Sequence, residues 1–248
     1  MKRTILVTLM LAGMFARSGE TQGRSDKEWQ NNVFIYGLAT AISGETRLGP
    51  IENPVDITFS DILDNLEGGF MGRYRGANER FSIVADFIYL DLGKEQDSGL
   101  LRRADLEQLV VDITGGYRLS PIAEVVFGVR ITDLSTGVRF VSPRFGNQLD
   151  LGGSHTFYDP IVGARLATTL DENEKWWVQA HGDIGGFGAS MDLTWQVMAN
   201  VGFKPAQWIS IWGGYRALGQ DFDKAGDRDL FGATLTYFGP AFGVGFHF

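Results

Sequence analysis

His181 and Asp183 are the two residues whose types and spacing come nearest to a catalytic pair. They stand two positions apart, so on an extended strand both side chains point to the same face. A carboxylate beside an imidazole can activate water or a hydroxyl group for hydrolysis. No nucleophile is placed convincingly next to them, because Ser190 falls at a tight turn. We therefore expect no catalytic residue and no enzyme, with a hydrolase using His181 and Asp183 as the alternative.

A wider set of charged residues recurs at alternate positions of the chain. Counted from the nearest short turn, most of them lie roughly five to eight residues along their predicted strands, which places them in one layer. Charges removed from water must pair and hydrogen-bond. We interpret the layer as a structural network, with a narrow polar path or a small-ligand site as the alternative. Its members are Asp86, Asp112, Arg130, Arg165, His181, Asp183 and Arg216.

The segment Asp221–Asp229 partly fits a calcium-binding loop. Acidic residues stand at its positions one, three, seven and nine, with Gly226 at six. Ala225 at position five and Gly232 at position twelve supply no side-chain ligand, so the motif is incomplete. The chain has no cysteine, and its three histidines lack zinc-site spacing: His155, His181 and His247. We expect no metal ion and no cofactor.

These residues belong to a chain whose dominant hydrophobic period is two, which is typical of β-strands. In 105–119, for example, Leu109, Val111 and Ile113 share one face, while Asp112 and Thr114 share the other. The same alternation predicts ten strands, at about 29–43, 66–76, 80–92, 105–119, 124–140, 154–170, 175–188, 191–204, 207–219 and 229–248. A single antiparallel barrel of ten strands follows, with eight strands as the alternative.

Alternation alone does not distinguish a soluble barrel from a membrane barrel. Three features favour the membrane barrel: long strands, short turns alternating with long loops, and aromatic residues on the apolar face at the short-turn ends. The aromatic residues are Tyr74, Phe81, Tyr117, Trp176, Phe203 and Phe248. The opposite face combines glycine with charges of both signs, as a crowded polar lumen requires. The fold class predicted is an all-β transmembrane barrel with a polar, small-residue lumen.

The N-terminus indicates a secreted protein. Residues 1–18 read as a signal peptide with a charged start and an apolar stretch too short to span a bilayer. Residues 19–28 are a polar leader, and 29–248 form the barrel. The chain of 248 residues has a net charge of −8, which argues against nucleic acid as a partner.

The C-terminal residues carry a family resemblance. Apolar side chains occupy every second position at the end of the chain, at Phe242, Val244, Phe246 and Phe248. This ending is similar to the C-terminal signal of Gram-negative outer-membrane barrels, which the barrel insertion machinery recognises. Further segments resemble an outer-membrane β-barrel family of the broad porin/OmpA-like class: 59–67, 115–120, 159–167, 183–197 and 214–224. The resemblance implies the fold and an outer-membrane location, with lipid and lipopolysaccharide as neighbours, but no activity and no oligomeric state.

We therefore predict a small outer-membrane barrel, structural or with at most a narrow passage for small solutes, since ten strands leave the interior largely filled. A soluble periplasmic ligand-binding barrel is a further alternative. Ser60–Leu66 is expected to form one or two helical turns with Ser60 as N-cap, as a lid, a partial plug or a rim element. Phe231–Tyr237 is apolar on the inner face, so either a bulge near Gly239 swaps the faces or this stretch stands above the bilayer.

Overall fold

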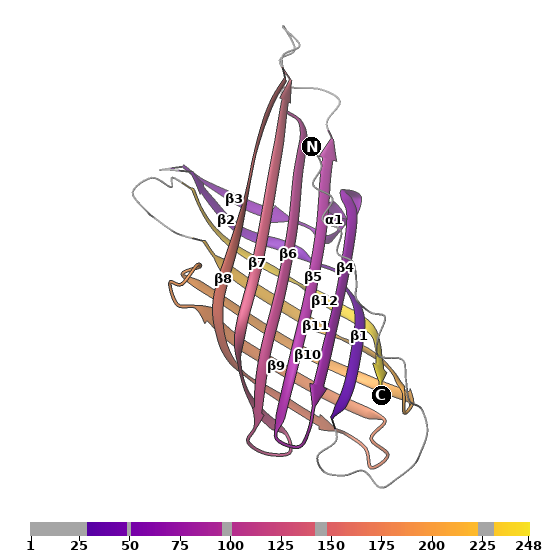
Figure 1. Cartoon of the computed structure of the whole chain (residues 1–248). Coiled ribbons are helices and arrows are strands. Elements are labelled where there is room, and N and C mark those ends of the chain that lie inside the picture. The colour runs from indigo at the N-terminus through magenta and orange to yellow at the C-terminus, as the bar shows by residue number, and fades with distance from the viewer. Residues whose placement is uncertain (1–28, 49–50, 96–100, 142–147, 223–230) are drawn as a thin grey trace.

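The fold is a closed antiparallel β-barrel, given by a computed structural model that describes residues 29–48, 51–95, 101–141, 148–222 and 231–248. Twelve strands form one sheet, and pairing of the first strand with the last closes ten of them into the barrel (Figure 1). The barrel strands are β1 (Gln30–Leu38), β4 (Leu66–Ala77), β5 (Phe81–Glu95), β6 (Leu101–Arg118), β7 (Ala123–Val141), β8 (Gln148–Thr169), β9 (Trp176–Gly186), β10 (Leu193–Ala206), β11 (Ile209–Asp221) and β12 (Phe231–His247). The all-β fold class and the ten-stranded barrel are confirmed. The proposed signal peptide and leader lie outside the described residues.

Each strand has one face toward the interior of the barrel, here called the lumen, and one face outward. Strand β10 shows the rule, because Thr194, Gln196 and Met198 are buried while Val197 and Val201 are exposed. Turns of a few residues join strands at one end, here called the short-turn end. There the Asn78 side chain accepts hydrogen bonds from the backbone of Arg80 and Phe81. At the other end, the long-loop end, β5 to β8 rise beyond the rest of the barrel (Figure 1).

The distribution of side chains is the reverse of that in a soluble domain. Large apolar residues are exposed around the outer wall, namely Ile83, Ile113, Phe127, Val162, Ile184, Val197, Ile211 and Phe242. On β5 this apolar face runs from Phe81, whose ring meets that of Tyr117 at 5.6 Å, to Tyr89. That distance is about 26 Å along the strand at ~3.3 Å per residue, and charged Asp91 follows it. Polar residues such as Arg130, Thr194 and Ser210 are fully buried inside.

Two expectations for the N-terminal part were wrong. The strand predicted at 29–43 is divided, since β1 ends at Leu38 and β2 (Ala41–Leu48) begins anew. The segment 44–65, expected to be a loop with a short helix at Ser60–Leu66, also contains the rest of β2 and the strand β3 (Ile51–Ile57) before the helix α1 (Phe59–Asp64). The reason lies in β12, whose lower part pairs with β1 and whose upper part, Phe231–Phe238, pairs with β2. The β2–β3 hairpin therefore covers an edge that would otherwise stay unpaired.

Strand β12 keeps the same residues facing the lumen along its whole described length. Its pairing with β11 is continuous from Ile209–Phe246 to Asp221–Thr234, so the predicted bulge near Gly239 is wrong. Gly239 instead allows close approach of the chain at Ala39, because a Cβ at Gly239 would collide with the Ala39 carbonyl oxygen. Ala233, Leu235 and Tyr237 of the inner face pack inside the barrel.

Helix α1 lies two residues earlier in the chain than predicted. Its N-cap is Thr58 rather than Ser60, because Thr58 and Asp61 form a reciprocal capping box. The hydrogen bonds from Thr58 also hold the pKa of Asp61 below its ordinary value. Of the large apolar residues in the segment 60–66, only Ile62 is buried, while Leu63 and Leu66 are exposed. No described helix is both long and apolar enough to cross a membrane.

Candidate functional site in the barrel lumen

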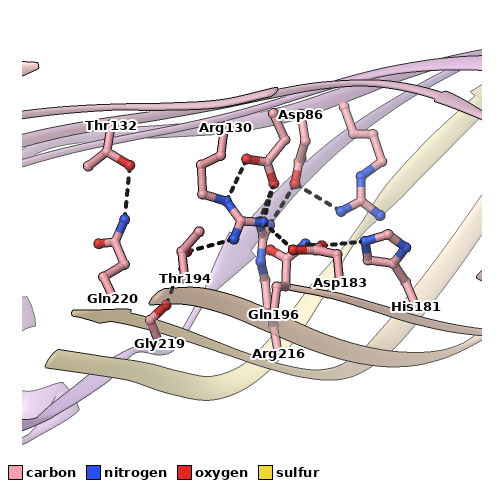
Figure 2. A network of polar contacts seen from close by, with 12 residues as sticks. Asp86, Arg130, Thr132, His181, Asp183, Thr194, Gln196, Arg216, Gly219 and Gln220 are labelled. Atoms are coloured by element: carbon pink, nitrogen blue, oxygen red, sulfur yellow. Dashed lines mark hydrogen bonds and ion pairs between the residues drawn. The ribbon is translucent and has the colours of Figure 1, made fainter. Parts of the chain in front are cut away.

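Arg130 lies at the centre of the lumen with none of its surface exposed. From β7, its guanidinium donates to both carboxylate oxygens of Asp112 on β6, at 2.8 and 3.0 Å. It also donates to Asp183 on β9 at 3.0 Å and to Thr194 on β10 at 2.9 Å. Figure 2 shows Arg130 meeting Asp183 and Thr194 between opposite walls of the barrel. The bidentate contact with Asp112 fixes the plane of the guanidinium. The contacts with Asp183 and Thr194 join β7 to strands that are not its neighbours.

A second cluster surrounds Asp86 on β5. Arg216 from β11 donates to Asp86 at 2.7 Å, and Arg73 from the adjacent β4 donates to the same carboxylate at 2.9 Å. The Tyr36 hydroxyl donates to Asp86 at 2.8 Å and accepts from Arg216 at 2.8 Å. Arg216 also lies 3.8 Å from Asp112, which links the two clusters into one layer. Arg73 and Tyr36 were not among the predicted members.

Arg165 does not belong to this layer. It pairs with Glu124 at 3.2 Å, nearer the short-turn end, and Arg75 pairs with the same carboxylate at 3.3 Å. Ser82 also contacts Glu124. The prediction that Arg165 joins the middle layer is therefore wrong. Counting along the chain ignores the stagger of tilted strands, which sets Arg165 opposite Glu124 in the β7–β8 register.

His181 and Asp183 do form a pair. The Nε2 atom of His181 lies 2.7 Å from Asp183, and Gln196 donates to the same carboxylate at 3.1 Å. Asp183 also forms an ion pair with Arg130, so the charge of the Asp183 carboxylate is already neutralised within the network. Ser190 lies apart from this pair and donates to the Tyr158 carbonyl at 3.2 Å. The geometry is that of a histidine hydrogen-bonded within a buried network.

One arrangement escaped the sequence reasoning. The His247 ring bridges Asn32 on β1, at 2.6 Å from Nδ1, and Ser210 on β11, at 2.9 Å from Nε2. A hydroxyl, an imidazole and an orienting amide in this order resemble the parts of an acyl-transfer site. Ser210, however, has no exposed surface, so its hydroxyl cannot meet a substrate in this conformation. The closure of β1 onto β12 brings these residues together, and no local pattern indicates it.

Above the ionic layer the lumen is apolar. The buried residues that fill it come from α1, the β2 strand and the barrel wall: Ile42, Ile62, Leu92, Val110, Leu218 and Tyr237. Between this cluster and the ionic layer, Gln108 donates to Gln220 at 3.2 Å and Gln220 donates to Thr132 at 2.9 Å. The helix thus contributes Ile62 to a plug. Its other large side chains stay at the surface.

The remaining predicted residues have clear positions. Phe242 and Phe248 of the C-terminal pattern are exposed on the outer wall. Val244 shares that face, and Phe246 is partly buried. Within the described residues, no group of three or more histidine or acidic side chains is arranged to hold a metal ion. The candidate calcium loop lies largely outside the described residues.

Comparisons with known proteins give fold similarity only. No family model and no curated protein matches the chain. Among solved structures, the Ail protein of Yersinia pestis is 12% identical with a TM-score of 0.40, covering 89% of this chain and 98% of its own. The Pseudomonas putida toluene transporter TodX is 10% identical with a TM-score of 0.36, covering 90% of each chain. The NalP translocator domain of Neisseria meningitidis is 11% identical with a TM-score of 0.32, covering 92% of this chain and 90% of its own.

Replacing Arg130 with alanine tests the network. The substitution leaves the carboxylates of Asp112 and Asp183 without their guanidinium partner in a buried site, so we expect a loss of about 3–5 kcal/mol in unfolding free energy. Denaturant unfolding of the refolded protein measures it. The matched control is Arg139→Ala, which removes an exposed ion pair with Asp150 and should cost below ~1 kcal/mol. Equal effects of the two substitutions would refute a buried paired layer.

Proposed function

We propose that the chain is a small barrel of the Gram-negative outer membrane with a closed lumen and a structural role. The observation that carries this proposal is the reversed distribution of side chains, with exposed apolar residues around the outer wall and paired charges inside. Lipid offers the apolar surroundings that such a wall needs. Lipid and lipopolysaccharide are then its neighbours. The barrel insertion machinery is the proposed partner of the C-terminal strand, whose Phe242 and Phe248 face outward.

The substitution Val197→Arg separates a membrane barrel from a soluble one. Val197 is 54% exposed in the middle of β10. In lipid a charge at this depth should cost about 2–4 kcal/mol of unfolding free energy. Ser154→Arg, outward-facing near the long-loop end, is the control and should cost about 0–1 kcal/mol. Unfolding in lipid vesicles measures both. If both substitutions fall within ~0.5 kcal/mol of the parent, the barrel is not lipid-facing.

Two consecutive barriers support a closed lumen. The ionic layer places the fully buried guanidinium of Arg130 across the middle of the barrel. The apolar cluster around Ile62 and Tyr237 fills the lumen between this layer and the long-loop end. An ion crossing the barrel would have to part the charge pairs and then pass through apolar side chains. Both steps are costly in a medium of low dielectric constant.

Planar-bilayer recording tests closure. We expect the refolded full chain to insert without producing stable conductance steps, because the two barriers exclude a continuous water path. Heat-modifiable migration on gels verifies that the sample is folded, and detergent without protein is the control. Reproducible single-channel steps at neutral pH would overturn the closed-lumen proposal and support the narrow-passage alternative.

We propose further that the barrel is not an enzyme. The two hydrogen-bonded histidine groups, at His181 and His247, lie where no exposed nucleophile is within hydrogen-bond reach in the described residues. Ser210 is the hydroxyl closest to a catalytic arrangement, and its burial argues against acyl transfer. A serine-reactive fluorophosphonate should therefore leave the folded barrel unlabelled. Labelling that disappears in Ser210→Ala would show a hydrolase instead.

A further inference from the structure

A cavity opens within the lumen on the short-turn side of the ionic layer. Its volume is about 410 Å³ including the open mouth. Three of its lining residues are arginines, Arg73, Arg75 and Arg165. Trp177 and Trp212 contribute two of its aromatic side chains. No acidic side chain of the described residues lines it. The cavity wall is therefore cationic and aromatic.

The carboxylates near the cavity are outnumbered by guanidinium groups. Glu124 is shared by Arg75 and Arg165, at 3.3 and 3.2 Å. Asp86 is shared by Arg73 and Arg216, at 2.9 and 2.7 Å. In the ionic layer Arg73, Arg130 and Arg216 are balanced by Asp86, Asp112 and Asp183. Glu124 alone faces both Arg75 and Arg165, so one positive charge remains beside the cavity. In a barrel of low dielectric constant, uncompensated charge favours an anionic ligand.

Several hydrogen-bond donors around the cavity are buried without a partner among the described residues. They are the indole N–H groups of Trp177 and Trp212 and the Nε–H groups of Arg73 and Arg75. Trp212 is 94% buried, as its exposed fraction is 6%, so its N–H has little access to bulk water. A buried donor without an acceptor costs about 1–3 kcal/mol. Four such donors, against one unpaired acceptor among the described residues of the cavity lining, the side-chain oxygen of Asn200, favour a ligand that accepts hydrogen bonds.

We propose that this cavity binds a small oxyanion, with a carboxylate or phosphate group received by Arg75 and Arg165 and by the indole N–H of Trp212. Guanidinium groups match the paired oxygens of such a group. The site goes beyond the proposed structural role, and binding requires no conduction.

Ligand titration of the refolded full chain in detergent micelles tests the site. Sodium phosphate, sodium acetate and sn-glycerol 3-phosphate are titrated at constant ionic strength, held with the bulky sulfonate HEPES. Calorimetry gives the stoichiometry, and tryptophan fluorescence reports the cavity through Trp177 and Trp212. We expect saturable binding of one anion per chain. Tight binding of glycerol phosphate indicates a lipid headgroup as the source, whereas preference for phosphate or acetate indicates a free solute.

Substitutions then locate the binding. Arg75→Gln leaves the Arg165–Glu124 pair intact, so the barrel should fold while the affinity falls about tenfold or more through loss of a charged hydrogen bond. Arg139→Gln, an exposed arginine on β7 toward the long-loop end, is the matched control and should bind like the parent chain. If heat-modifiable migration shows that Arg75→Gln is unfolded, the affinity of Trp212→Phe is measured instead. This substitution keeps an aromatic side chain and removes the indole N–H. Absence of saturable binding, or equal affinity in the parent and the folded variants, overturns the site.

Discussion

The structure depends on the pairing of guanidinium and carboxylate groups across the lumen. A barrel whose outer wall is apolar has to place its polar residues inside, where water cannot solvate each charge fully. Arg130 meets this constraint by bridging Asp112 on its neighbouring strand and Asp183 on β9. Arg216 does the same with Asp86 on the opposite side of the barrel. Such pairs contribute less to net stability than their distances suggest, because desolvation offsets much of the attraction. A shift of register would separate these partners, so the pairs also favour the observed register.

The lumen is divided by this layer into two parts with different chemistry. Toward the long loops, apolar side chains pack as they do in a soluble core, and α1 adds Ile62 to them. Toward the short turns, arginines and indoles line a cavity whose donors outnumber their acceptors. A barrel that needed only mechanical stability could fill both parts with apolar residues. The polar cavity is therefore the part of the lumen that structural filling does not explain.

The barrel fold could be predicted from the sequence, but the level of each residue along the barrel could not. Alternation in segments such as 105–119 identified which residues face inward, and this property is local to each strand. The level of each residue depends on how neighbouring strands are staggered, which is not local. Asp112 and Arg130 do lie in one layer. Arg165 stands at a similar count from its turn, but the stagger of the strands places it beside Glu124. The β2–β3 hairpin was predicted to be a loop because glycine and proline residues, which are typical of loops, occur near 44–54.

The two polar arrangements nearest the short turns differ in the access of water to them. Hydrogen bonds link His247 to Asn32 and to Ser210, and the Ser210 hydroxyl has no access to solvent. Their role is therefore to join β1, β12 and β11 by a chain of hydrogen bonds. The arginines and indoles that line the cavity keep N–H groups without a hydrogen-bond partner among the described residues. Residue types alone favour the first arrangement as a reactive site, because it resembles an acyl-transfer triad. Unsatisfied hydrogen bonding and the open mouth of the cavity favour the second, because a site must both admit a ligand and gain from binding it.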